Sequence, residues 1–312
     1  MNWIKQGLIF KPKGNFYWNR SYASVPTPIF KRSGDLRVYY SSRDINNRSY
    51  VSFIDLDINN PKKILYEHQL PVLSPGKPGM FDDCGVMPSH AIVVDDEIWM
   101  YYLGWNVRNT IPYHNSIGLA ISSDGGITFK KFSEGPLFDR NYNEPYYSGM
   151  PYVIKEKNLW KMWYLSNTKW IQFKNKKEPY YHIKYAESSN GIDWIRNAKV
   201  AIDFKNEKEC GIVRACVNKI ESTYIMWYSY RNIDSYRENK DNSYRIGYAE
   251  STNGNDWERK DSEAGIDRSN SGWDSQMIEY PFVLTIKDKK YMFYNGNKFG
   301  ESGFGYAELI VK

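Results

Sequence analysis

Residues 162–166 (Met-Trp-Tyr-Leu-Ser) and 185–194 (Tyr-Ala-Glu-Ser-Ser-Asn-Gly-Ile-Asp-Trp) form a unit that recurs through most of the chain. The aromatic residue after the Met or Val of the first stretch recurs at positions 39, 101, 163, 227 and 293. Self-similarity at a nearly fixed period is typical of repeat architectures. The repeat is therefore the feature from which the fold is predicted.

Each unit is predicted to contain four strands. An apolar run marked by Pro, such as 151–154, and the aromatic run after a short polar turn are expected to pair as a hairpin. A third run, such as 183–186, leads into Asn-Gly or Asp-Gly, which tolerate the positive φ of tight turns, and then into a strand that begins with Trp or Phe. Helical periodicity is absent from the long windows. The sequence therefore predicts an all-β fold, a five-bladed β-propeller of four-stranded blades.

The two ends of the chain are predicted to meet. The fifth unit stops after its third strand, and residues 3–9 resemble the fourth-strand segment 194–200. We expect the N-terminal strand to complete the last blade and close the ring, which removes an exposed edge. A single domain over 1–312 follows, because repeat architectures grow by adding units. The predicted blades are approximately 20–70, 82–138, 144–203, 209–267, and 274–312 together with 1–10.

Composition restricts the class of protein. The net charge of +6 is modest for 312 residues and no basic run resembles a nucleic-acid arm, so no nucleic-acid partner is expected. Three cysteines without paired spacing, and no apolar run at the N-terminus suited to a signal peptide, favour a reducing, cytoplasmic setting. No apolar window approaches the roughly 20 residues of a membrane span. The four histidines lack metal-ligand spacing and no Gly-rich phosphate loop is present, so no metal and no cofactor are predicted.

Propeller topology predicts which residues converge. The starts of the inner strands and the loops after the second strands open on one face. Four acids near the inner strands, Asp82, Glu144, Glu209 and Asp274, each stand seven residues before Ser89, Pro151, Cys216 and Pro281. A feature copied in four units fits either catalysis or a structural role such as capping backbone amides. Residues that interrupt the repeat are better functional candidates.

The candidate residues follow from this placement. The catalytic candidates are Asp83 and Glu279, then Asp82, Glu144 and Glu209. The candidates for substrate binding are Arg20, Arg43, Asp44, His90, Trp105, Arg108, Trp170, Arg214, Arg231, Tyr280 and Asn295.

Three stretches carry a resemblance to a known superfamily: 82–88 (Asp-Asp-Cys-Gly-Val-Met-Pro), 185–188 (Tyr-Ala-Glu-Ser) and 303–307 (Gly-Phe-Gly-Tyr-Ala). The chain resembles the five-bladed propeller glycosidases, which include the arabinanases and β-xylosidases, the invertases and the mannoside phosphorylases. The likeness covers almost the whole chain and is closest to uncharacterised glycosylase-like proteins of bacterial surface-polysaccharide clusters. It implies an inverting pair of carboxylates, with a third acid that tunes them, at the starts of inner strands.

The sequence departs from this superfamily on the first inner strand. The family's base is usually an Asp next to a Pro, but residues 24–28 (Ser-Val-Pro-Thr-Pro) contain no acid. Inversion needs an acid and a base about 6.5–9.5 Å apart. Asp44 could replace the missing base, or Asp83 and Glu279 could form the pair. The phosphorylases imply instead a phosphate held by basic groups, which the arginines could supply because guanidinium pairs bidentately with oxyanions.

Two classes of function stay open. The first is a carbohydrate-active enzyme that cleaves or transfers a glycosyl unit of a carbohydrate or sugar-phosphate substrate, including a phosphate-dependent phosphorylase. The second is a glycan-binding or scaffold propeller without catalysis. A sialidase is a third interpretation, because 122–129 matches the Ser-x-Asp-x-Gly-x-Thr-Phe box, although that box is a turn on the opposite face. The sugar, the linkage and the oligomeric state are left open.

Overall fold

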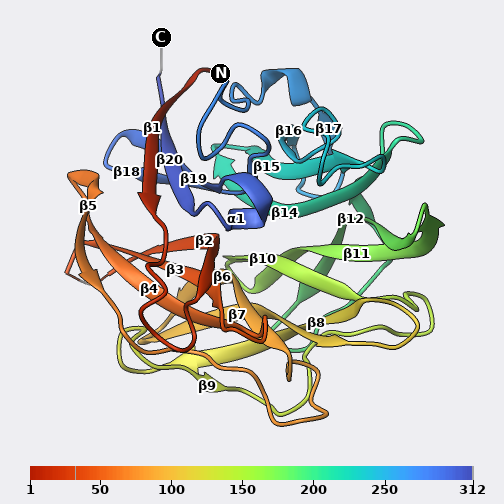
Figure 1. Cartoon of the computed structure of the whole chain (residues 1–312), viewed down its shortest axis with the longest axis horizontal. Helices are drawn as coiled ribbons and strands as arrows, with labels where there is room; N and C mark the ends of the chain where they lie inside the picture. Colours follow the sequence, from red (N-terminus) through yellow and green to blue (C-terminus); the bar gives the residue numbers. More distant parts are fainter. Residues whose placement is uncertain (32, 311–312) are drawn as a thin grey trace.

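A computed structural model describes residues 1–31 and 33–310 of the chain, and strands dominate this part (Figure 1). The strands up to residue 131 are β1 (Trp3–Phe10), β2 (Ser21–Phe30), β3 (Leu36–Arg43), β4 (Ser49–Asp57), β5 (Asn60–Glu67), β6 (Gly85–Val94), β7 (Glu97–Val107), β8 (Tyr113–Ser122) and β9 (Lys130–Lys131). They are followed by β10 (Ser148–Glu156), β11 (Leu159–Phe173), β12 (Lys176–Ser188), β13 (Val200–Ile202), β14 (Glu209–Ile220), β15 (Thr223–Asn232), β16 (Arg245–Ser251), β17 (Glu258–Arg259), β18 (Glu279–Ile286), β19 (Lys289–Asn295) and β20 (Phe304–Leu309). The helical elements are a 3-10 turn (Asp261–Glu263) and α1 (Asn297–Gly300). The predicted all-β class is confirmed.

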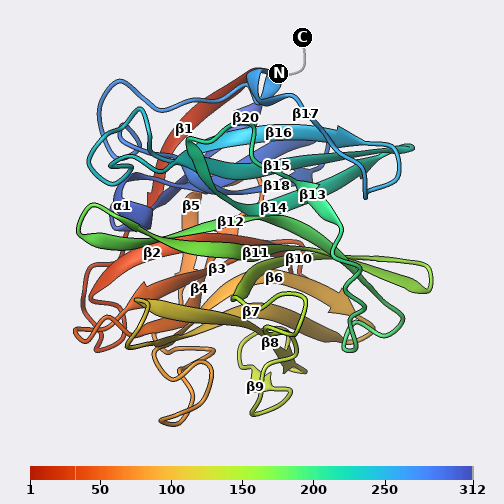
Figure 2. The same ribbon diagram turned by 90° about the vertical axis from the view of Figure 1, so that its right-hand side faces the viewer.

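Antiparallel pairing follows the order of the repeat. Consecutive strands pair in the groups β2-β3-β4-β5, β6-β7-β8-β9, β10-β11-β12-β13 and β14-β15-β16-β17. The last group has the order β18-β19-β20-β1, in which Trp3 lies opposite Leu309. Figures 1 and 2 both show β1 beside β20 at one end of the molecule. The N-terminal strand therefore pairs where the sequence predicted.

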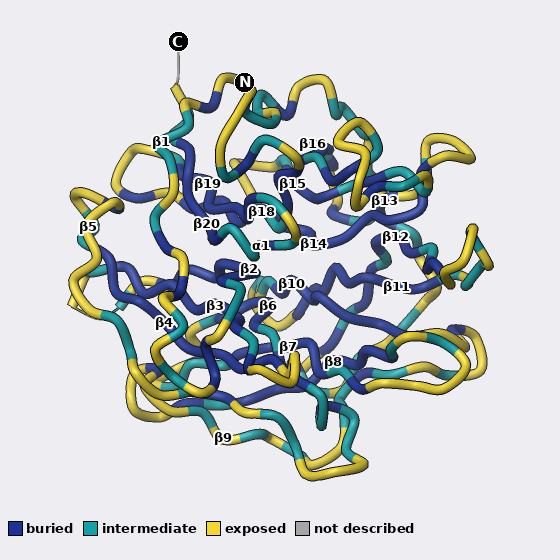
Figure 3. The backbone as a smooth tube through the Cα atoms, viewed as in Figure 1, coloured by how far each residue is buried: buried dark blue, intermediate teal, exposed yellow. Residues whose placement is uncertain are grey.

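The first strands of the five groups touch one another in a cycle. β2 contacts β6 and β18, β10 contacts β6 and β14, and β14 contacts β18. Between neighbouring groups, one parallel bridge joins β4 to β6 and another joins β12 to β14. The first strands thus form the centre of the molecule, and the later strands of each group lie farther out. Figure 3 shows the same gradient, with buried backbone inside and exposed loops at the periphery.

In the first three groups, the repeated aromatic residue of the second strand fastens its group to the following one. The hydroxyls of Tyr39 and Tyr101 each donate at 2.8 Å to the carbonyls of Gly126 and Gly191. Trp163 Nε1 donates to the Gly254 carbonyl at 2.9 Å in the same manner. These glycines have positive φ, and a Cβ on Gly126 would lie 1.9 Å from the Tyr39 hydroxyl, so the turn requires Gly there. The Gly-containing turns thus have a structural role.

Each first strand also carries an irregularity where it crosses the centre. The pairing register shifts by one residue, and the extra residue has positive φ in four groups: Val25, Met150, Arg214 and Tyr280. Positive φ is rare for residues other than Gly, and a bulge turns side chains away from the regular alternation. Beyond the bulge, Cys216 pairs with Trp227 as His90 pairs with Tyr101. The predicted equivalence of Cys216 with Ser89 is therefore wrong by one residue, because Glu209 stands one residue closer to its strand than the other three acids do.

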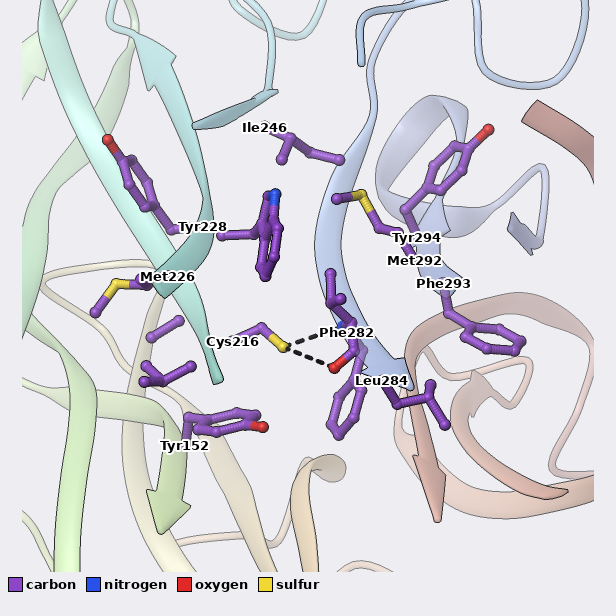
Figure 4. Packing of buried hydrophobic residues seen from close by; sticks show 14 of the residues in the cluster. Tyr152, Cys216, Met226, Tyr228, Ile246, Phe282, Leu284, Met292, Phe293 and Tyr294 are labelled. Carbon is purple, nitrogen blue, oxygen red and sulfur yellow. Dashed lines mark hydrogen bonds between the residues drawn. The ribbon is translucent and has the colours of Figure 1, made fainter. Parts of the chain in front are cut away.

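Apolar side chains fill the centre below the bulges. The ring of Phe282 lies 5.8 Å from that of Tyr152, and Cys216 is completely buried near both (Figure 4). The backbone N–H of Val283 donates to Cys216 Sγ at 3.0 Å. The centre is therefore packed with side chains and does not form an open channel at this level. None of the described helices is long and apolar enough to cross a membrane.

Candidate functional site

A pocket of about 420 Å³ lies above the packed centre, and all five groups of strands or their adjoining loops contribute to its lining. Most of the residues that line it belong to first, second or third strands, and the others lie in adjoining loops and in α1. They are Tyr22, Ser24, Arg43, Met87, Leu103, Trp105, Pro112, Tyr113, Asn115, Tyr147, Met150, Leu165, Tyr181, Val213, Tyr236, Arg237, Tyr244, Tyr280 and Phe299. The bulges place Met150 and Tyr280 in this lining.

The charged side chains of the lining are arginines. Arg43 and Arg237 line the pocket, and no Asp or Glu is found among its described lining residues. Arg237 forms an ion pair with Glu178, which also accepts a hydrogen bond from Tyr236 at 3.0 Å. The guanidinium of Arg43 lies 4.8 Å from the ring of Tyr22, and the described residues give it no ion-pair partner. The pocket is therefore positively charged.

Glu279 is completely buried and is not itself among the residues that line the pocket, although its chain neighbour Tyr280 is. Glu279 begins β18. Counted from the bulge, it occupies the same position in its strand as Ser24, Met87 and Val213, three residues of the lining. Neither of its carboxyl oxygens has a hydrogen-bond partner among the described residues. Burial raises the pKa of the Glu279 carboxyl well above its usual range, against smaller opposing effects of Asn295 and Arg231. Burial therefore favours the protonated form of the Glu279 carboxyl.

A second buried group consists of Arg231 and two tyrosines of the lining. Arg231 Nε lies 3.2 Å from both the Tyr181 and the Tyr244 hydroxyl, and these two hydroxyls contact each other closely. The guanidinium stacks on Tyr236 with its central carbon 3.7 Å from the ring centre. Its Nη1 is 2.6 Å from Cys210 Sγ, and burial raises the pKa of that thiol to about 11. Neutral groups therefore surround the Arg231 charge.

Arg214 and His90 lie in the packed centre and do not line the pocket. Arg214 Nη2 donates to Thr27 Oγ1 at 3.0 Å and to the Pro26 carbonyl at 3.2 Å, and Nη1 donates to the Ser89 carbonyl. His90 packs on Tyr152 with 4.1 Å between ring centres. Burial, together with the charge of Arg214, lowers the pKa of His90 to about 3. These two candidates thus connect first strands to one another.

The four repeated acids lie outside the pocket lining, in ion pairs. Asp82 pairs with Lys131 at 2.6 Å and Asp274 with Lys5 at 2.7 Å, and each accepts a tyrosine hydroxyl. Glu144 is contacted by Lys184 at 2.9 Å and Arg196 at 3.3 Å. Arg259 donates both of its terminal nitrogens to Glu209, at 2.8 and 3.1 Å. This arrangement matches the structural alternative for the repeated acids.

The two other acidic candidates are also outside the lining. Asp83 Oδ2 accepts from the Gly79 N–H at 2.8 Å, and its Oδ1 has no partner among the described residues. Asp44 accepts from the backbone N–H groups of Asn46 and Arg48 and from the Arg48 side chain. Asp44 therefore stabilises its own turn, and neither Asp83 nor Asp44 lines the pocket.

The remaining candidates are divided between the pocket and the surface. Trp105 and Tyr280 line the pocket. Asn295 is buried opposite Glu279, and its Oδ1 accepts from the Val25 N–H at 3.0 Å. Trp170 packs edge-on against Tyr113, one residue of the lining. Arg20 and Arg108 are exposed and lie outside it.

Several lining residues were missed by the sequence analysis. Asn115, Tyr181 and Tyr244 each stand two residues before an Ile of the third strand, at 117, 183 and 246. That spacing in the repeat is a signal that could have identified them. Tyr113, Tyr147 and Phe299 follow no such spacing, and only the tertiary structure places them in the lining. Among the described residues, no cluster of His, Cys, Asp and Glu is suited to holding a metal ion.

Comparison with known proteins identifies a related sequence and solved structures of the same fold. No family model matches the chain. The uncharacterised protein MT1551 of Mycobacterium tuberculosis is 36% identical over 309 residues, which is 99% of each chain. A glycosyl hydrolase from Bacteroides ovatus superposes with a TM-score of 0.72 at 16% identity, over 98% of this chain and 93% of that one. A thermostable family-43 glycoside hydrolase gives 0.67 at 18% identity, over 96% and 93%. The predicted resemblance to propeller glycosidases is confirmed at the level of fold.

Proposed function

The chain belongs to the same family as the uncharacterised mycobacterial protein MT1551 and has the fold of glycoside hydrolases, and from its pocket we propose that it is a carbohydrate-active enzyme that cleaves or transfers a glycosyl unit. The observation that carries this proposal is Glu279, a completely buried carboxylic acid with a raised pKa that immediately precedes the lining residue Tyr280. Strongly shifted acids in a cleft are typical of catalytic sites.

We propose for the architecture a five-bladed β-propeller in one domain over 1–312, closed by β1. The cyclic contacts of the first strands and the pairing of β1 with β20 support it. In such a ring, ligands bind where the loops of all blades converge, and the pocket draws on every group. A cytoplasmic location and a role in surface-polysaccharide metabolism stay predictions from the sequence.

Glu279 is suited to the role of general acid. It would transfer its proton to the oxygen of the leaving group as the glycosidic C–O bond breaks, and the electron pair of that bond would remain on the departing oxygen. An acceptor oxygen would form the new bond to the anomeric carbon. Aromatic side chains such as Tyr22 and Trp105 offer flat apolar faces of the kind that stack on sugar rings.

The group that accepts the glycosyl unit is left open. Water needs a base, and the described residues of the lining include no carboxylate. Phosphate is already an anion and needs none, so the arginine-rich lining favours phosphorolysis as a second candidate reaction. A glycan-binding protein without catalysis is the alternative that the missing base also allows.

The test is glycoside turnover by the parent chain and by Glu279→Gln, over a panel of aryl glycosides with and without phosphate. Loss of a general acid typically costs about 100- to 10,000-fold. Glu207→Gln, on an exposed loop, is the matched control. A parent that binds glycans but releases no sugar under either condition would establish the binding alternative, and a Glu279→Gln variant with parental turnover would exclude Glu279 as the acid.

A further inference from the structure

We propose that the pocket contains an oxyanion subsite, formed by the hydroxyls of Tyr181 and Tyr244 with Arg231 behind them and Arg43 in the lining, that binds a carboxylate or phosphate group carried by the sugar. This inference rests on the proposed function only for the sugar part of the ligand. The oxyanion part of the ligand is inferred from the distribution of charge around the pocket.

The arginines around the pocket exceed the acids available to neutralise them. Glu178 is shared between the Tyr236 hydroxyl and Arg237. Arg231 is buried against Tyr181, Tyr236, Tyr244 and Cys210, and the described residues offer it no carboxylate within ion-pair distance. A buried charge without a counter-ion is costly, and an anionic group of a ligand would offset that cost.

The hydroxyls of Tyr181 and Tyr244 can connect the buried Arg231 charge to a ligand in the pocket. Arg231 Nε donates toward both phenol oxygens at 3.2 Å, so these oxygens act as acceptors on the buried side. The two hydroxyls also contact each other, which uses one of their two protons. One O–H remains free to donate, and both tyrosines line the pocket. A donor polarised by a guanidinium binds an anionic acceptor more strongly than a neutral one.

Arg43 provides direct charge on the lining. It reaches the pocket from the end of β3, beside Tyr22 and 5.8 Å from the Trp105 ring centre. The Arg43 guanidinium is thus held near the rings of Tyr22 and Trp105, and neither ring neutralises its charge. No Asp or Glu among the described lining residues opposes this charge. A sugar whose ring lies on the aromatic residues would place an acidic substituent toward the arginines.

The experiment is calorimetric titration of the full chain with D-glucuronate, D-glucose 1-phosphate and inorganic phosphate, with D-glucose as the neutral comparator. We expect at least one anionic probe to bind, more weakly as salt is raised, and D-glucose to bind at least tenfold less tightly than that probe. The carboxylate and phosphate arms identify which group the subsite takes. No binding of any anionic probe at millimolar concentration, or equal binding of D-glucose, overturns the proposal.

Two variants connect the binding to the named residues. Tyr244→Phe preserves ring packing and removes one hydroxyl, and Arg43→Gln removes the charge of the lining. Each should weaken the anionic probe by about tenfold to a hundredfold, as is usual for a hydrogen bond to a charged group, and leave the neutral probe unchanged. Arg140→Gln, at an exposed position, is the matched control. Parental affinity in both variants would place the anion elsewhere and overturn the proposal.

The outcome is separable from that of the proposed enzymatic function. Anion binding that depends on Tyr244 and Arg43, with no glycoside cleaved, supports the subsite and refutes the enzyme. Cleavage of neutral glycosides that depends on Glu279, without binding of any anionic probe, supports the enzyme and refutes the subsite.

Discussion

Glu279 and Asn295 lie opposite each other on β18 and β19, yet the Glu279 carboxyl accepts no hydrogen bond among the described residues while Asn295 Oδ1 accepts from the Val25 N–H at 3.0 Å. Asn295 Oδ1 thus fixes the neighbouring first strand. A buried carboxyl without an ion-pair partner among the described residues has a different chemistry from the paired carboxylates of an inverting glycosidase. The consequences can be measured.

The pH dependence of stability should report the state of Glu279. Its folded pKa is raised above the unfolded value, so its contribution is fully present below the unfolded pKa of about 4.3 and is lost as pH rises toward the folded pKa. Each pH unit within that window lowers the free energy of unfolding by about 1.4 kcal/mol. Melting curves of the parent and of Glu279→Gln should therefore diverge in favour of the variant as pH rises from about 5. Parallel pH profiles would show that Glu279 is ionised in the folded chain.

The N-terminal strand should be essential to stability. Deleting residues 3–9 removes the pairing of β1 with β20 and the 2.7 Å ion pair of Lys5 with Asp274. It also exposes the edge of β20, which promotes aggregation. We expect a large fall in melting temperature or an aggregated product. A truncated chain that melts within a few degrees of the parent would contradict the closing role of β1.

Two single substitutions in β1 distinguish the contribution of side-chain burial to stability from that of backbone pairing at the sheet edge. Trp3 is 5% exposed and packs edge-on against Trp227 at 5.9 Å, whereas Leu8 in the same strand is 43% exposed. Trp3→Ala should cost about 3–5 kcal/mol in the free energy of unfolding, and Leu8→Ala less than about 1 kcal/mol. Chemical denaturation measures both. Equal losses would mean that the strand acts through its backbone alone.

Glu144 should contribute to stability rather than to catalysis. Glu144→Gln removes the charge that Lys184 and Arg196 contact and leaves both cations partly buried. Breaking a buried ion pair from one side costs about 3–5 kcal/mol. Unfolding by urea should show a loss of this order, and turnover at a temperature where the variant is folded should match the parent. A loss of turnover in the fully folded variant would return the repeated acids to the catalytic candidates.

Arg214 should act as a connection between strands. Its guanidinium joins β14 to the Pro26 carbonyl and Thr27 Oγ1 of β2 and to the Ser89 carbonyl of β6. Lys has a single nitrogen and cannot reach all three acceptors, so Arg214→Lys should lower the melting temperature. Anion binding by calorimetry should persist in the folded variant, because Arg214 does not line the pocket. A selective loss of binding at parental stability would show instead that Arg214 reaches the ligand.

The sequence by itself determined the strands, their order and the meeting of the two ends. The reason is that these are local: each unit repeats its own turn residues and alternation, and the resemblance of residues 3–9 to 194–200 shows which strand was missing. The tertiary structure decided which side chains share the pocket. Strand pairing makes Cys216 equivalent to His90, one position away from the equivalence that the spacing of the acids predicted. The one-residue bulges of the first strands are also a feature of the tertiary structure. They also leave Arg214 in the packed centre and Tyr280 in the pocket. The unpaired states of Glu279 and Arg231 depend on distances between residues far apart in the chain, and no spacing in the sequence encodes them.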